Sequence, residues 1–165
     1  MSVVGVAPDR EARTLTMTAE YDAPVEQVWR LWADPRLLER WWGPPTYPAT
    51  VHEHDLRPGG RVVYSMTGPE GDTHYGWWRP GRVDPPTGLE LEDGFGDADG
   101  TPAEGMPTTR VRVDIADAGG GRTRMTVTST FPSAEAMDQM LQMGMAEGMR
   151  EALGQTYPLL EGSAA

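Results

Sequence analysis

The sequence predicts an α+β fold, in which a curved antiparallel sheet of about seven strands wraps around one long C-terminal helix. Two observations lead to this prediction. A segment near the start alternates polar and apolar residues with the period of a β-strand, and six similar segments follow it between turn-forming residues. Two short segments with helical periodicity separate the first strand from the others, and a long helical segment follows the last strand.

The first strand and the two short helices are well marked. Residues 12–21, ARTLTMTAEY, alternate strictly, which predicts a half-buried strand. Residues 24–34, PVEQVWRLWAD, form a helix with Pro24 in its first turn. A second short helix, PRLLERWW, begins at Pro35 and ends before the Gly-Pro-Pro of residues 43–45, because proline cannot continue a helix.

Turn-forming residues such as RPGG, PEGD and DPPT then separate six strands, as in an antiparallel meander. The last two strands make the clearest hairpin, in which the apolar side chains of the first should face Met125 and Val127. Residues 93–107 are expected to form a long loop. The six predicted strands cover ATVHEHDL (49–56), RVVYSMT (61–67), HYGWWRPGRV (74–83), GLELEDGF (88–95), TTRVRVDIAD (108–117) and GRTRMTVTSTF (121–131).

The C-terminal segment predicts a single helix of about 24 residues, or roughly 36 Å, with Ser133 as its cap. Pro158 should end this helix or bend its last turn. No other predicted element is long enough to cover the sheet, so the sheet must curl around it. Because Gly144 and Gly148 supply no bulk, a cavity is expected between helix and sheet, and such cavities bind small apolar molecules.

Composition narrows the functions further. A chain of 165 residues is expected to form one domain, residues 1–165, with a core from about residue 14 to 160 and flexible termini. Its 25 acidic residues outnumber 14 basic ones, and the resulting charge of −11 disfavours nucleic acid and anionic membranes as partners. No apolar run approaches the roughly 20 residues that span a bilayer, and no signal peptide is evident, which favours a cytoplasmic protein without membrane insertion.

Three motifs resemble a known superfamily: YDAPVEQVWRLWADPRLLERWWGP (21–44), DLRPGG (55–60) and GMAEGMREAL (144–153). Their order and spacing are similar to those of the helix-grip (SRPBCC) superfamily of START and Bet v 1-like proteins, in the branch related to the activator of Hsp90 ATPase. The resemblance runs from about Thr14 to Leu160 and implies the fold predicted above. Met149 departs from the pattern, since many relatives carry tryptophan there, which implies a softer or larger pocket.

The resemblance leaves several functions open, because the superfamily includes lipid carriers, polyketide cyclases and aromatases, hormone receptors, antibiotic self-resistance proteins and a chaperone regulator. We expect binding of a small hydrophobic molecule between the sheet and the C-terminal helix, by a monomer or weak homodimer without a cofactor. The alternatives are a cyclase-like or aromatase-like enzyme and a module that binds a chaperone partner. A partner-binding module should expose an apolar patch, whereas a carrier or enzyme should hide its apolar surface.

The expected ligand contacts are side chains predicted to face the cavity. Trp77 and Trp78 must lie on opposite faces of their strand. Trp78 is an even number of residues from His74, so it shares the face of His74 and is predicted to point inward. Trp41 and Trp42 cannot both point toward the same side of their helix, because the side-chain directions of adjacent helical residues differ by about 100°. Packing in the core and contact with a ligand both remain open for the tryptophans and methionines. The predicted contacts are Trp32, Trp41, His54, Tyr64, Met66, His74, Trp78, Met137, Met140, Leu141, Met145 and Met149.

Evidence for catalysis is thin. The sequence has no cysteine and no GxSxG, HExxH or nucleotide-binding motif. Acid–base chemistry is the remaining route, and its titratable candidates are His54, His74, Tyr64 and Glu92. His52 and His54 are expected to share one strand face, but zinc would need a third strong ligand, so no metal site is predicted.

Overall fold

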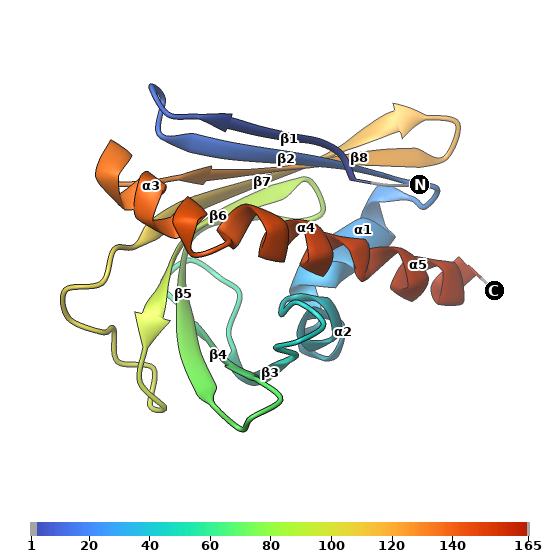
Figure 1. Cartoon of the computed structure of the whole chain (residues 1–165). Helices are drawn as coiled ribbons and strands as arrows, with labels where there is room; N and C mark the ends of the chain where they lie inside the picture. Colours follow the sequence, from blue (N-terminus) through green and yellow to red (C-terminus); the bar gives the residue numbers. More distant parts are fainter. Residues whose placement is uncertain (1–2, 165) are drawn as a thin grey trace.

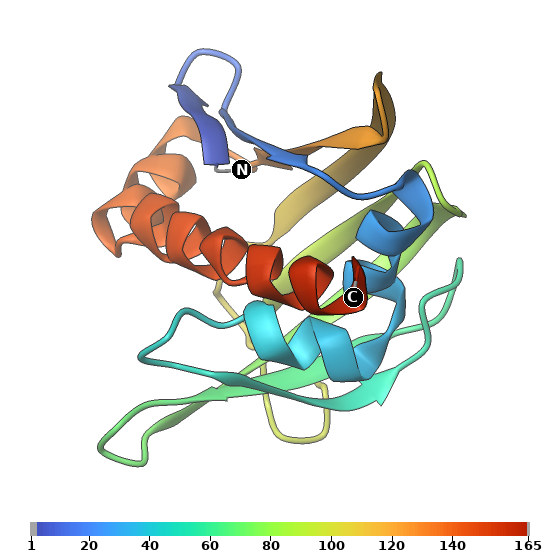
Figure 2. The ribbon, with the colours of Figure 1, turned by 90° about the vertical axis from the view of Figure 1, so that its right-hand side faces the viewer.

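The computed structural model describes residues 3–164. Eight antiparallel strands form one curved sheet in the order β1-β2-β8-β7-β6-β5-β4-β3. The helices lie on its concave side, and the C-terminal ones run across the opening (Figures 1 and 2). The strands are β1 (Val3–Asp9), β2 (Thr14–Tyr21), β3 (Ala49–His54), β4 (Val62–Thr67), β5 (Thr73–Asp84), β6 (Gly88–Gly96), β7 (Thr109–Gly119) and β8 (Arg122–Thr130).

Five helices accompany the sheet. They are α1 (Val25–Ala33), α2 (Pro35–Trp41), α3 (Ala134–Gln142), α4 (Met145–Gly154) and α5 (Thr156–Ala164). This arrangement confirms the predicted α+β helix-grip fold, although the strand count differs by one. Within residues 3–164, no helix is both long and apolar enough to cross a membrane.

The additional strand is β1, which lies at the edge of the sheet and pairs with β2, with Val6 opposite Met17. Its sequence contains Gly5 and Pro8, and both residue types are depleted in strands. Proline is nevertheless tolerated in an edge strand, where one side of the backbone has no partner. The structure thus places residues 3–9 in a strand that the sequence did not predict.

The C-terminal helical segment is not one helix. It breaks at Gly144, whose φ of 88° is left-handed and cannot continue a right-handed helix. Figure 1 shows α3 leaving the direction of α4 at this point. Pro158 lies in the first turn of α5, where its missing N–H is tolerated, so it does not end the helix.

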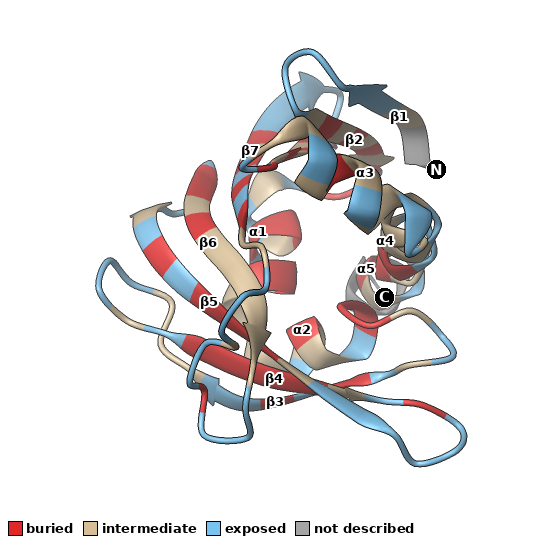
Figure 3. Cartoon of the chain, turned by 60° about the vertical axis from the view of Figure 1, so that its left-hand side comes forward, coloured by how far each residue is buried: buried red, intermediate tan, exposed pale blue. Residues whose placement is uncertain are grey.

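Buried residues alternate with more exposed ones along strands such as β2 and β7 (Figure 3). The predicted hairpin is confirmed, since Val113 lies opposite Val127 and Ile115 opposite Met125. All four of these side chains are buried beneath the helices. The hairpin therefore supplies the central floor of the core, against which α1 packs.

Candidate functional site

An aromatic cluster fills the core where the first two helices meet the sheet. It consists of Trp32 of α1, Trp41 and Trp42 at the end of α2, Tyr64 of β4 and Trp78 of β5. Contacting ring centroids lie between 4.8 and 6.1 Å apart, mostly edge to face, which is a favourable arrangement for aromatic rings. Trp78 points inward as predicted, and both Trp41 and Trp42 are buried.

The cluster carries a polar pair at its edge. The Tyr64 hydroxyl donates a hydrogen bond of 2.8 Å to Oδ1 of Asp93. Burial raises the pKa of Asp93 to about 7, although the hydrogen bond from Tyr64, the Gly94 backbone N–H and the nearby Trp78 indole act in the opposite direction. Burial and the nearby Asp93 carboxylate also raise the pKa of Tyr64 well above its ordinary value. The pair therefore includes a carboxyl group that changes charge near neutral pH.

Gly76 makes room for this pair. It lies opposite Tyr64 in the register of β4 and β5. A Cβ atom at residue 76 would lie 2.3 Å from the Tyr64 hydroxyl oxygen, so any side chain there would displace the ring. Glycine at this position thus allows the tyrosine to lie flat across β5 and reach Asp93.

A cavity of about 40 Å³ opens beside the polar pair. Such a volume holds a few water molecules, whereas sites for drug-sized ligands occupy about 300–1,000 Å³. Its walls come from the sheet, the loop before β7 and helix α3, through Tyr64, Asp93, Gly94, Phe95, Pro107, Thr109 and Met140.

The glycines of α4 do not form this cavity. A Cβ atom at Gly144 or Gly148 would have no other heavy atom within 4 Å, so neither glycine is in close contact with the sheet. The cavity found in the structure lies instead beside α3.

Apart from His54 and His74, the predicted ligand contacts fall into two groups. Trp32, Trp41, Tyr64, Trp78 and Met137 are buried in the core. A second group packs against the core while remaining partly exposed, and consists of Met66, Met140, Leu141, Met145 and Met149. Tyr64 and Met140 line the cavity.

The three histidines do not converge. His52 is the extra residue of a β-bulge, and its ring hydrogen-bonds the Ser65 hydroxyl at 2.7 Å. His54 Nε2 lies 3.0 Å from the Trp32 carbonyl oxygen, and His74 is exposed beside Asp72. The expectation that His52 and His54 share a face is wrong, because the bulge changes the alternation between them. Among the described residues, no three His, Asp or Glu side chains are grouped to hold a metal.

The carboxylate in the site is Asp93, and the sequence prediction named its neighbour Glu92. Glu92 lies on the outer face, paired with Arg79 at 3.4 Å and accepting a hydrogen bond from Thr108. Asp93 belongs to both the predicted strand 88–95 and the predicted loop 93–107, and in the structure β6 continues through Gly96. The signal was present, because Asp93 has the same parity as the inward-facing Leu89 and Leu91.

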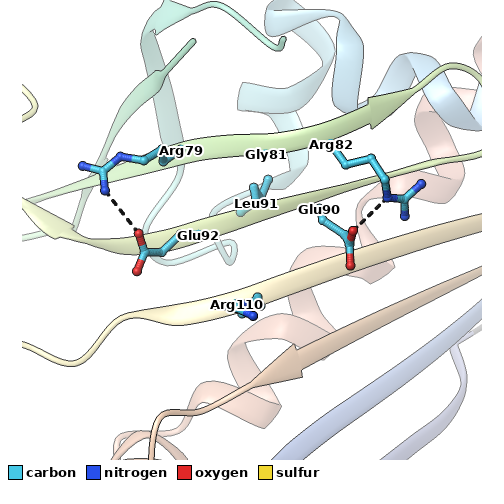
Figure 4. A pocket seen from close by; sticks show the side chains of 7 residues that line it. All are labelled: Arg79, Gly81, Arg82, Glu90, Leu91, Glu92 and Arg110. Atoms are coloured by element: carbon cyan, nitrogen blue, oxygen red, sulfur yellow. Dashed lines mark hydrogen bonds and ion pairs between the residues drawn. The ribbon is translucent and has the colours of Figure 1, made fainter. Parts of the chain in front are cut away.

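A larger hollow, of about 390 Å³, lies on the outer face of β5, β6 and β7. Figure 4 shows its two ion pairs, Arg79 with Glu92 and Arg82 with Glu90. These charges are partly exposed and already paired, so they contribute little energy and offer a ligand little unsatisfied charge. The interior polar pair is the better candidate site.

A curved antiparallel sheet, helices on its concave side and a site in the interior between them are the features of a helix-grip protein. A family model described as activator of Hsp90 ATPase homolog 1-like protein matches residues 22–161. The chain belongs to this family, as the motifs predicted.

Solved structures of similar proteins agree with this assignment. A protein from Arthrobacter aurescens is 46% identical, with a TM-score of 0.92, and the match covers 98% of this chain and 93% of that one. A protein from Mycobacterium smegmatis is also 46% identical, with a TM-score of 0.87 and 96% of each chain covered. Among curated proteins, none matches the chain.

The fold also occurs in a protein of the dynemicin biosynthetic locus. That protein is 21% identical with a TM-score of 0.63, and the match covers 90% of this chain and 47% of that one. At this identity the likeness concerns the fold alone.

Proposed function

We propose that this protein binds a small, mainly apolar molecule in its interior, beside the Tyr64–Asp93 pair and under α3. The observation that carries the proposal is a hydrogen-bonded polar pair beside a cavity at the edge of an aromatic core. Ligand sites typically combine apolar walls with a few such polar groups.

The existing cavity is smaller than such a ligand, so binding requires side chains to move. Met140 lines the cavity, and Met145 and Met149 of α4 pack against the core. Methionine has an unbranched side chain that changes rotamer readily and adapts to irregular shapes. A ligand would enter by displacing methionine side chains rather than by filling a preformed cavity.

The exposed surface supports an interior ligand over a docked protein. Among the residues whose side chains are described, Met106 and Met143 are the only large apolar ones that are exposed. A protein-docking module should expose a contiguous apolar patch. The apolar surface of this protein is instead concentrated between sheet and helices.

Two methionines of the same helical segment test the proposal. Met140 lines the cavity, while Met143 is 61% exposed. Met140→Gln should weaken binding of an environment-sensitive apolar dye by about tenfold, because it places an amide in the apolar wall. Met143→Gln, the control, should leave dye affinity unchanged. Equal affinities in the folded variants would contradict the proposal.

Native mass spectrometry of freshly purified protein offers an independent check. A bound small molecule that is retained by the wild type and lost from Met140→Gln is the expected result. Retention of the same molecule by both methionine variants would place its site elsewhere.

A further inference from the structure

Two buried donors in the aromatic cluster lack acceptors. The indole N–H groups of Trp42 and Trp78 meet no hydrogen-bond partner among the described residues, although these tryptophans are only 5% and 0% exposed. An unsatisfied buried donor is destabilising, so native proteins rarely keep one without a reason. The other two tryptophans of the cluster have acceptors, since Trp32 donates to the Met125 sulfur and Trp41 to the Leu31 carbonyl.

The two unpartnered donors lie beside the polar pair. The Trp42 and Trp78 rings lie with their centroids 5.9 and 6.1 Å from that of Tyr64. Both indole N–H groups act to lower the pKa of Tyr64, and that of Trp78 acts in the same way on Asp93. They approach these oxygen atoms without reaching hydrogen-bond geometry with either. The Tyr64 proton is already engaged by Asp93. An oxygen atom placed among the four side chains would therefore find two donors and one carboxylate acceptor.

A hydroxyl group fits this set of partners best. Its oxygen can accept hydrogen bonds from the indole N–H groups, and its proton can be donated to the Asp93 carboxylate. An ether or carbonyl oxygen could accept the same bonds but would turn lone pairs toward a carboxylate. A ligand without oxygen would leave both indole donors unsatisfied.

We propose that Trp42, Tyr64, Asp93 and Trp78 form a hydroxyl subsite, which selects an alcohol or phenol carried on an otherwise apolar molecule. This inference rests on the proposed function, because it assumes that the interior takes up a small ligand.

Three matched probes can test the subsite: naphthalene, a naphthol and the methyl ether of that naphthol. Titrations at about pH 8 keep Asp93 mainly ionised, since its pKa is about 7. The naphthol should bind at least about tenfold more tightly than the ether, as expected for one hydrogen bond to a charged group. Naphthalene, which satisfies neither donor, should bind most weakly.

Variants on the two sides of β5 locate the preference. Trp78→Phe removes an interior donor, so the preference for the naphthol over naphthalene should fall severalfold. Trp77→Phe is the matched control, because the Trp77 N–H donates to the Phe95 carbonyl at 2.9 Å and its ring lies outside the core cluster. Asp93→Asn should reduce the preference for the naphthol over the ether, since it removes the charged acceptor.

The outcomes separate this inference from the proposed function. Equal binding of all three probes overturns the hydroxyl subsite and leaves the interior ligand site standing. Binding of none of them overturns both. A preference for the naphthol that persists unchanged in Trp78→Phe and Asp93→Asn also overturns the subsite. If Trp78→Phe does not fold, Asp93→Asn decides alone, because asparagine keeps the size of aspartate and an acceptor for Tyr64.

Discussion

At Asp93, burial changes the chemistry of a carboxyl group. Its pKa is about 7 in the folded protein, against an ordinary 3.8, so the folded state binds the proton more tightly than the unfolded state. The groups that act on it are Tyr64, the Gly94 N–H and Trp78, and no charged side chain is among them. The stabilising contribution of the protonated carboxyl is thus complete below about pH 4 and is lost as the pH rises through 7.

Asp93→Asn should remove this pH dependence, because asparagine stays neutral. At about 1.36 kcal/mol per pKa unit, wild-type stability should fall by at most roughly 4 kcal/mol relative to the variant between about pH 4 and pH 7. Urea denaturation across this range measures the difference. Glu92→Gln, on the outer face, is the control and should keep the wild-type slope. Parallel curves for wild type and Asp93→Asn would contradict the assignment.

Sequence alternation alone identified some site residues and missed others. Trp78 could be placed because it has the same parity as His74 along its strand, and Tyr64 was among the predicted ligand contacts. Asp93 lies where the predicted strand 88–95 overlaps the predicted loop 93–107, and the glycines that follow it favour a loop, whereas β6 continues through Gly94 and Gly96. No local signal marks the bulge at His52, since it depends on how β3 pairs with β4.

At the scale of elements, the break between α3 and α4 depends on backbone conformation. Helical spacing of the apolar residues continues across Gly144, so the sequence predicts one helix. A glycine inside a helical pattern often costs only about 1 kcal/mol, and the sign of its φ angle is set by the packing of the flanking helices. The break sets the direction of α3, which carries Met140 to the cavity.

Gly144, which caps α4, and Gly148, which lies inside it, should respond in opposite ways to replacement by alanine. Gly144 has a φ of 88°, so Gly144→Ala should destabilise the protein by about 1–2 kcal/mol. Gly148 lies inside α4 with open space around it, so Gly148→Ala should stabilise by roughly 0.5–1 kcal/mol. Thermal denaturation compares the two variants. Stabilisation of similar size in both would mean that Gly144 lies inside a helix that continues from α3 to α4 in solution.

For the whole molecule, the order of strands and helices could be predicted because the strands alternate, the turns are distinctive and the last helical segment has one surface to cover. The edge of the sheet could not be predicted in the same way. β1 is held by its pairing with β2 and by contact with α4, and these contacts leave no regular pattern in a short segment that contains glycine and proline.

Deletion of residues 1–9 tests how much this edge strand contributes. Val6 packs against the core in a partly buried position, and full burial of one valine side chain contributes about 1.5–3 kcal/mol. The deletion should lower the free energy of unfolding by about 1 kcal/mol or more and should turn β2 into a free edge. Because an uncovered edge strand can pair with another chain, the shortened protein should also associate as its concentration rises. Urea denaturation and sedimentation velocity, with the full-length chain at matched concentrations as control, measure the two effects. Unchanged stability and unchanged sedimentation would mean that β1 does not cover the edge in solution.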